Sequence, residues 1–175
     1  MRITQLIRMK SLILAILLVL CGLQEGCNYG LRGNNPPEGI NKLYVPLFEN
    51  TSNFAEADIR ERFTQNLKDK IVSDNTFLLD DKEKADGMLT CNITTVTDEP
   101  LVISGNETVT KRKLTINVSA DLQNLKTGKQ IWQKNFNNFG EYNSSSGTFS
   151  ERVIGVNEAI DKITEDILND LTSNW

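Results

Sequence analysis

The chain has 175 residues, a formal net charge of −4 and no histidine. This mildly acidic balance gives no overall electrostatic attraction to nucleic acid or to anionic membrane surfaces, so neither is expected as a partner on charge alone. Without histidine, the chain lacks both the commonest general base and the commonest zinc ligand of proteins. The composition therefore favours a structural or binding role.

Residues 1–26 have the organisation of a bacterial export signal peptide. Arg2, Arg8 and Lys10 give a positively charged start, and the segment Ser11–Leu23 is almost entirely apolar. That run is shorter than the roughly 20 apolar residues that a membrane-spanning helix needs. We therefore exclude residues 1–26 from the folded domain.

Cys27 follows the signal peptide and is the candidate lipid-attachment residue. Gly26 is the small residue that a lipoprotein signal peptidase needs directly before the cysteine, whereas Gln24 and Glu25 fit the preceding positions poorly. Two interpretations remain: acylation of Cys27, or ordinary cleavage nearby. In either case Cys91 is left without a partner cysteine for an internal disulfide.

A lipid anchor and tether over residues 27–40 and a single domain over residues 41–175 are expected next. Lys42–Phe48 alternates apolar and polar side chains, which is typical of a strand. Pro46 favours an edge position or a strand end, because proline cannot donate to a β-ladder. Ala55–Ser73 has an apolar residue every four positions and predicts an amphipathic helix with Glu56 facing water.

Three further strands and a second helix are predicted in the rest of the chain. The strands are Leu89–Thr94, with Cys91 on its buried face, Lys113–Leu122 and Ile131–Phe139. Thr148 and Glu151 form a capping box that begins a helix with apolar residues spaced by three and four. The asparagine- and serine-rich stretch Asn135–Ser146 either lines a wet interface or forms a plain polar loop.

The predicted order of elements is β-α-β-β-β-α. Because the strands alternate and the helices are apolar on one side, this order favours an α+β fold. We predict a two-layer sandwich with a four-stranded sheet and two helices.

Catalytic and metal-binding motifs are missing from the sequence. It contains no glycine-rich phosphate loop and no cluster of residues with metal-ligand spacing. A serine or cysteine nucleophile would have no histidine to activate it. We therefore predict a protein that is not an enzyme, with no catalytic residues, no metal ligands and no cofactor.

Lys111, Arg112 and Lys113 are the candidate binding residues. Adjacent cations on an acidic domain can hold phosphate or sugar-acid groups. Strand alternation would place Lys111 and Lys113 on one face and Arg112 on the other, so at most two of them converge. The alternative is a solvated strand end that protects the sheet against edge pairing.

Several short motifs resemble a known family in their order along the chain. They are Cys27-x-Tyr29-x-x-x-Gly33, Val45-Pro46-x-Phe48-x-Asn50, Gly105-Asn106-Glu107, Leu114-Thr115-Ile116-x-Val118, and Phe136, Phe139 and Tyr142 before a helix ending near Trp175. In this order they resemble the LptE-type lipopolysaccharide-assembly lipoproteins, particularly the short forms of Bacteroidetes-like bacteria.

The resemblance implies a lipoprotein held by acyl chains such as palmitate on Cys27 at the periplasmic face of the outer membrane. It implies that the protein plugs the LptD β-barrel, assists its folding, and binds lipopolysaccharide through Lys111, Arg112 and Lys113. The segment Val45–Asn50 and the helix after it also resemble curli-secretion and TolB N-domain lipoproteins. The alternative function is therefore a part of a secretion pore or envelope scaffold.

Overall fold

The computed structural model describes residues 36–173, apart from positions 57, 105–107 and 145–148. These residues belong to one compact unit, Gly33–Trp175. Cys27 and the residues up to 35 lie outside the described part of the chain, as do Thr148 of the predicted capping box and Trp175.

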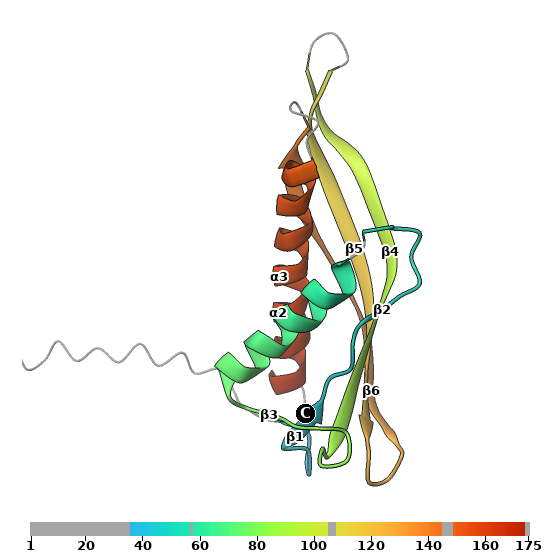
Figure 1. Ribbon diagram of the computed structural model, residues 1–175, viewed down its shortest axis with the longest axis vertical. Helices are drawn as coiled ribbons and strands as arrows, with labels where there is room; N and C mark the ends of the chain where they lie inside the picture. Colours follow the sequence, from blue (N-terminus) through green and yellow to red (C-terminus); the bar gives the residue numbers. More distant parts are fainter. Residues whose placement is uncertain (1–35, 57, 105–107, 145–148, 174–175) are drawn as a thin grey trace, which may run out of the picture. The chain divides into compact units, whose positions relative to one another are not determined.

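The described residues form one mixed sheet and two helices (Figure 1). In chain order the elements are β1 (Lys42–Tyr44), β2 (Glu49–Asn50), α2 (Ile59–Asp74), β3 (Leu78–Leu79), β4 (Gly87–Ser104), β5 (Thr108–Asn124), β6 (Gln130–Asn143) and α3 (Phe149–Ser173). The sheet order is β3-β1-β4-β5-β6, and β2 pairs with β4 beyond the end of β1. The α+β class with two helices is confirmed.

The prediction of four strands is wrong, because the sheet has six. The predicted strand Lys42–Phe48 is shorter in the structure: β1 ends at Tyr44 and pairs with the start of β4 at Gly87. β2 begins at Glu49, after the predicted strand, and pairs with β4 further along at Asn92. Pro46 has no N–H to donate, so the ladder is interrupted there. The sixth strand is β3, in a segment expected to be a connector, which pairs in parallel with β1.

β4 and β5 are longer than predicted and form an antiparallel hairpin that extends beyond the helices (Figure 1). β4 continues through Pro100, where the register shifts between Pro100 and Val102. The proline is tolerated because β1 and β2 pair only with the first part of β4, up to Ile93. Its missing N–H therefore falls on a free side of the strand.

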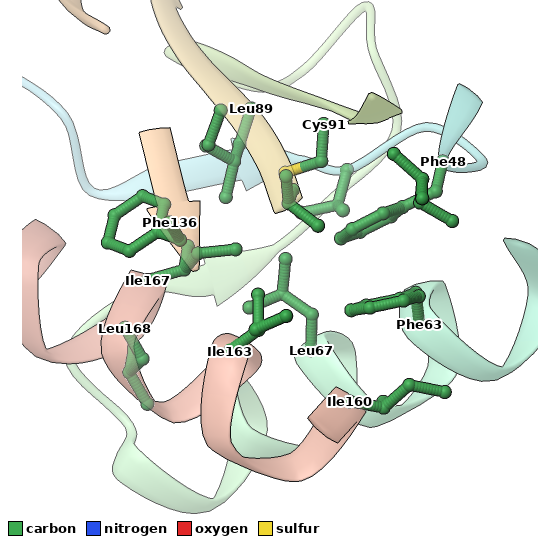
Figure 2. Packing of buried hydrophobic residues seen from close by; sticks show 14 of the residues in the cluster. Phe48, Phe63, Leu67, Leu89, Cys91, Phe136, Ile160, Ile163, Ile167 and Leu168 are labelled. Atoms are coloured by element: carbon green, nitrogen blue, oxygen red, sulfur yellow. The ribbon is translucent and has the colours of Figure 1, made fainter. Parts of the chain in front are cut away.

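The hydrophobic core lies between one face of the sheet and the two helices, which cover the same side of it (Figures 1 and 2). Phe48 and Phe63 stack with ring centroids 5.1 Å apart and link β2 to α2. Cys91 is buried within this core, as predicted, and burial raises the pKa of its thiol. β5 contributes a full row of buried side chains: Leu114, Ile116, Val118, Ala120 and Leu122.

Helix α2 begins later than predicted, at Ile59. The residues before it are held in a turn by Asn50, whose Oδ1 accepts a hydrogen bond from the Ser52 N–H (3.0 Å) and whose Nδ2 donates to the Phe54 carbonyl (3.1 Å). The helix ends at Asn75 in the left-handed conformation (φ 61°), which asparagine tolerates well.

The expectation that the Glu56 side chain faces water is wrong. Glu56 is only 6% exposed and forms ion pairs with Arg62 of α2 and Arg152 of α3. Arg62 also donates a hydrogen bond to Asn157 of α3 (2.8 Å). The carboxylate therefore connects the segment before α2 to the first turns of α3.

Candidate functional site: the open sheet face and its basic end

The second face of the sheet carries no helix in the described part of the chain (Figure 1). Its residues follow from the strand register, because side chains paired across an antiparallel ladder share a face. Phe139 lies on this face opposite Thr115, and Glu99, Lys113 and Glu141 form its charged end. Between that end and Asp121 the face comprises Thr90, Asn92, Thr95 and Thr97 of β4, Thr115, Asn117, Ser119 and Asp121 of β5, and Gln133, Asn135 and Asn137 of β6. These eleven residues are half-buried or exposed, and Asp121 alone among them is charged.

We call these residues the open face. Two of its amides donate hydrogen bonds: Asn137 Nδ2 donates to Asn117 Oδ1 on the same face (2.6 Å), and Asn92 Nδ2 donates to Oγ1 of Thr51, which follows β2 (3.0 Å). Such groups both donate and accept, so they can bond to water or to polar groups of a partner without an ion pair. The stretch starting at Asn135 was expected to be a wet interface or a polar loop, and it lies in β6 on this sheet as far as Asn143.

The three predicted basic residues lie at one end of the sheet, on two different faces. Lys111 and Lys113 pair with Asn143 and Glu141 of β6 and point to the side of the open face. Arg112 pairs with Tyr142 and points to the helix side. The structure therefore brings the two lysines together and separates the arginine from them.

Arg112 already has an anionic partner. Its Nε donates to Asp98 Oδ1 and its Nη2 to the Asp98 carbonyl oxygen, both at 2.8 Å. The Tyr142 hydroxyl donates to the other carboxylate oxygen at 2.6 Å. The hydrogen bond to Asp98 raises the pKa of Arg112, and burial together with the same carboxylate raises the pKa of Tyr142. This cluster fixes β4, β5 and β6 to one another beside the first turns of α3, where Tyr142 faces Gly155.

The lysines are held more loosely. Lys111 lies 3.8 Å from Glu141, and both side chains are well exposed (50% and 40%), so this ion pair is weak. The Lys113 ammonium lies 4.2 Å from the centre of the Phe139 ring, and Lys162 of α3 lies 4.7 Å from the same ring. Cation–π contacts of this kind leave the ammonium hydrogens able to bind an anion.

Sequence reasoning missed the partners of these cations. Asp98, Glu141 and Phe139 are 14 to 30 positions away from the basic residues that they contact and meet them only through strand pairing. The alternation of Lys111 and Arg112 was visible in the sequence, but the register that places Asp98 beside Arg112 depends on a bulge between Ile93 and Thr95. No local pattern marks that bulge.

The described residues offer neither a metal site nor a membrane-spanning helix. Within the residues that the structure describes, no three acidic or cysteine side chains gather closely enough to hold a metal ion. No helix in that same part is both long and apolar enough to cross a bilayer.

Solved structures of low sequence identity share this fold. Protein CT253 from Chlamydia trachomatis aligns with a TM-score of 0.54 and 8% identity, over 76% of this chain and 98% of that chain. Rare lipoprotein B from Shewanella oneidensis gives 0.52 and 14%, over 75% and 93%. PelC from Paraburkholderia phytofirmans, solved as a dodecamer, gives 0.50 and 11%, over 80% and 95%. Among curated proteins, none matches the sequence at a significant level.

The fold thus places the chain in a class of small α+β proteins with a long sheet covered on one side by two helices, a class that includes a bacterial lipoprotein. The sequence identifies the family. The LptE family of lipopolysaccharide-assembly proteins matches residues 40–173, which include almost the whole described domain. The chain therefore belongs to the LptE family, whose members are non-enzymatic envelope lipoproteins of lipopolysaccharide assembly.

Proposed function

We propose that this protein is an outer-membrane lipoprotein, attached through lipid on Cys27 and facing the periplasm. It occupies the lumen of the LptD β-barrel as a plug, assists the folding of that barrel, and binds lipopolysaccharide for transport to the cell surface. Membership of the LptE family supports the role in assembly. The observation that supports the plug most directly is the polar open face, in which Asp121 is the one charged residue.

The interior of a large β-barrel is polar and wet. A protein that fills it needs a surface whose polar groups remain hydrogen-bonded once they are enclosed, because an unsatisfied polar group costs free energy on burial. An array of threonine, serine, asparagine and glutamine meets this need, since each side chain can bond to the barrel wall or to trapped water. A lysine- and glutamate-rich face would instead require a matching charge for every side chain.

We further propose that Lys111, Arg112 and Lys113 bind the phosphate groups of lipopolysaccharide. Lys111, which is exposed, and Lys113, which is half-buried, lie on the same face of β5 and would make the direct contacts. Arg112, whose charge is compensated by Asp98 on the helix side, would hold the strand end in place.

The plug is tested by purifying the full-length chain from detergent-solubilised outer membrane. We expect one very large β-barrel protein to be recovered with it in a 1:1 ratio. Recovery of a closed ring of this chain without any barrel would contradict the proposal and would favour a role in a secretion pore or scaffold.

Lipopolysaccharide binding is tested with the double variant Lys111→Ala/Lys113→Ala. We expect binding to weaken roughly tenfold, equivalent to about 1.4 kcal/mol. Its matched control is Lys82→Ala/Lys129→Ala, which removes the same charge from exposed positions at the other end of the sheet. Equal binding by the two double variants would show that the basic strand end is only a solvated edge.

The lipid anchor is tested by mass spectrometry of the mature N-terminus. We expect a diacylated or triacylated Cys27. In the Cys27→Ser variant, we expect the chain to leave the membrane fraction, because acyl chains contribute about 0.8 kcal/mol per buried methylene to membrane binding. An unmodified N-terminus elsewhere in the chain would refute the anchor and leave the fold unaffected.

A further inference from the structure

β6 forms one edge of the sheet, and the structure shows which of its backbone groups face outward. The Phe139 carbonyl accepts a hydrogen bond from Lys162 Nζ (3.0 Å), and the Glu141 N–H donates to Glu158 Oε2 (3.0 Å). Backbone direction alternates along an antiparallel strand, so the odd-numbered residues of β6 direct their N–H and C=O groups away from β5. Gln133, Asn135 and Asn137 belong to this set.

The upper half of this edge, around Phe139 and Glu141, is covered by helix α3. Glu158 and Lys162, an ion pair one turn apart on the helix, bond to the outward groups of Glu141 and Phe139. Gly140 and Gly155 let the helix approach the strand here, since a Cβ on Gly140 would overlap the Gly155 carbonyl oxygen. No further strand can pair at this position.

Within the described residues, the lower half of the edge, from Gln133 to Asn137, is not bonded to the helix through its backbone. Gln133, Asn135 and Asn137 are exposed, and in the described part of the chain their outward backbone groups have no protein partner. Larger side chains separate the helix from the strand here: Trp132 donates to Asp170 (3.0 Å) and Asn138 to Asp166 (3.0 Å).

A groove of about 460 Å³ runs between this half of β6 and the last turns of α3. It is lined by Lys134, Asn135, Phe136 and Asn137 of the strand, and by Asp166, Asn169, Asp170 and Ser173 of the helix. The charge of Lys134 is compensated by an ion pair with Asp170. Among the described residues Asp166 forms no ion pair, so the groove retains an uncompensated negative charge.

We propose that an extended polypeptide segment of the barrel partner adds to the lower half of β6 as a further strand and places a basic side chain beside Asp166. The segment would bond to the outward groups of Gln133, Asn135 and Asn137. Its alternate side chains would enter the groove along α3. This inference rests on the proposed function, because it names the barrel as the source of the segment.

Two features favour an extended polypeptide as the occupant. A row of backbone donors and acceptors at the spacing of a β-ladder is matched best by another extended backbone. The exposed, negatively charged Asp166 complements a lysine or arginine on that segment and would repel the phosphates of a lipid.

The decisive variants are Asn135→Pro and Asn135→Ala in the full-length chain. Proline removes the outward N–H and places a ring at the edge, while every hydrogen bond between β5 and β6 is kept. Alanine removes the same side chain and keeps the N–H. We expect Asn135→Pro to reduce recovery of the barrel about tenfold, and Asn135→Ala to have little effect.

A second pair of variants does not change the strand backbone. Asp166→Lys should repel the basic side chain and lower barrel recovery, whereas Glu61→Lys, the same charge change on exposed α2, should not. In the purified complex, the amides of Gln133, Asn135 and Asn137 should exchange with deuterium more slowly than in the chain alone.

The outcomes separate the two proposals. If the unaltered chain recovers no barrel, the proposed function fails, and the inference fails with it. If the unaltered chain recovers the barrel but Asn135→Pro and Asp166→Lys recover it equally well, only the strand addition is refuted. A photo-crosslinker at Gln133 that captures a second copy of this chain would also refute it.

Discussion

The two faces of β5 show how one strand serves two purposes. Its even-numbered residues from Leu114 to Leu122 are buried against the helices, and its odd-numbered residues from Thr115 to Asp121 form the middle of the open face. The apolar row stabilises the fold, because burying one aliphatic side chain contributes about 1.5–3 kcal/mol. The polar row contributes little to stability, so its composition is available for recognition.

The low cost of changing the polar row bears on the composition of the open face, whose residues include no lysine or glutamate. Substitutions at such exposed positions change stability by only about 0.5 kcal/mol, so folding does not dictate which polar residue is present. In this protein the face is almost uniformly hydroxyl and amide. A partner with a polar surface, such as a barrel lumen, would favour this composition.

Two neighbouring substitutions in β5, one on each face, test this difference in stability most directly. Ile116→Ala should lower the free energy of unfolding by about 2–5 kcal/mol, because it leaves a cavity beneath the helices. Thr115→Ala, one position away, should change it by less than about 0.5 kcal/mol. Urea unfolding followed by circular dichroism measures both. Similar losses from the two variants would mean that the open face is covered in the folded protein.

The next largest loss of stability is expected from substitutions where α3 approaches β6 closely. Gly140→Ala places a Cβ against the Gly155 backbone, which cannot move aside as a side chain would, and we expect a loss of about 1–3 kcal/mol. Gly155→Ala meets mainly the Tyr142 ring at 3.0 Å, and alanine favours the helix by about 1 kcal/mol over glycine.

The thermal unfolding of the two glycine variants therefore makes a matched comparison. We expect a clear drop in Tm for Gly140→Ala and a small change of either sign for Gly155→Ala. If Gly140→Ala leaves Tm unchanged, α3 does not hold the upper part of β6 as closely as the structure indicates.

The sequence predicted the covered face well, because burial there is periodic. Every strand with a clear alternation, including Leu114–Leu122, appears in the sheet, and both apolar helices pack on one side of it. The two-residue strands β2 and β3 could not be predicted, since such short segments carry no period and form only because β4 and β1 are beside them.

The candidate site was predictable only in part, for the same reason. Alternation separates Arg112 from Lys111 and Lys113, but a single sequence does not give the register that brings Asp98 to Arg112. Glu56 was expected to face water because it lies off the apolar stripe of the helix predicted over Ala55–Ser73, yet two arginines from different helices compensate its charge in the interior. Long-range pairing of this kind leaves no local signal.

The smallest expected effect on stability comes from Glu158 and Lys162, which reach from α3 to the edge of β6. The hydrogen bond from Lys162, and then the one from the Glu141 N–H, lower the pKa of Glu158 below its ordinary value of 4.5. A carboxyl whose pKa is lower in the folded state stabilises the protein above pH 4.5. That stabilisation disappears as the pH falls through the folded-state pKa.

We therefore expect Glu158→Gln to be less stable than the unaltered chain at pH 7, by less than about 1 kcal/mol because the pair is exposed. The difference should vanish as the pH is lowered well below 4.5 in a series of urea unfolding curves. In a Lys162→Met background, the same substitution should have a smaller and less pH-dependent effect, because the largest cause of the shift has been removed. An equal effect in both backgrounds would mean that the Glu141 N–H, not Lys162, holds the carboxylate at the edge.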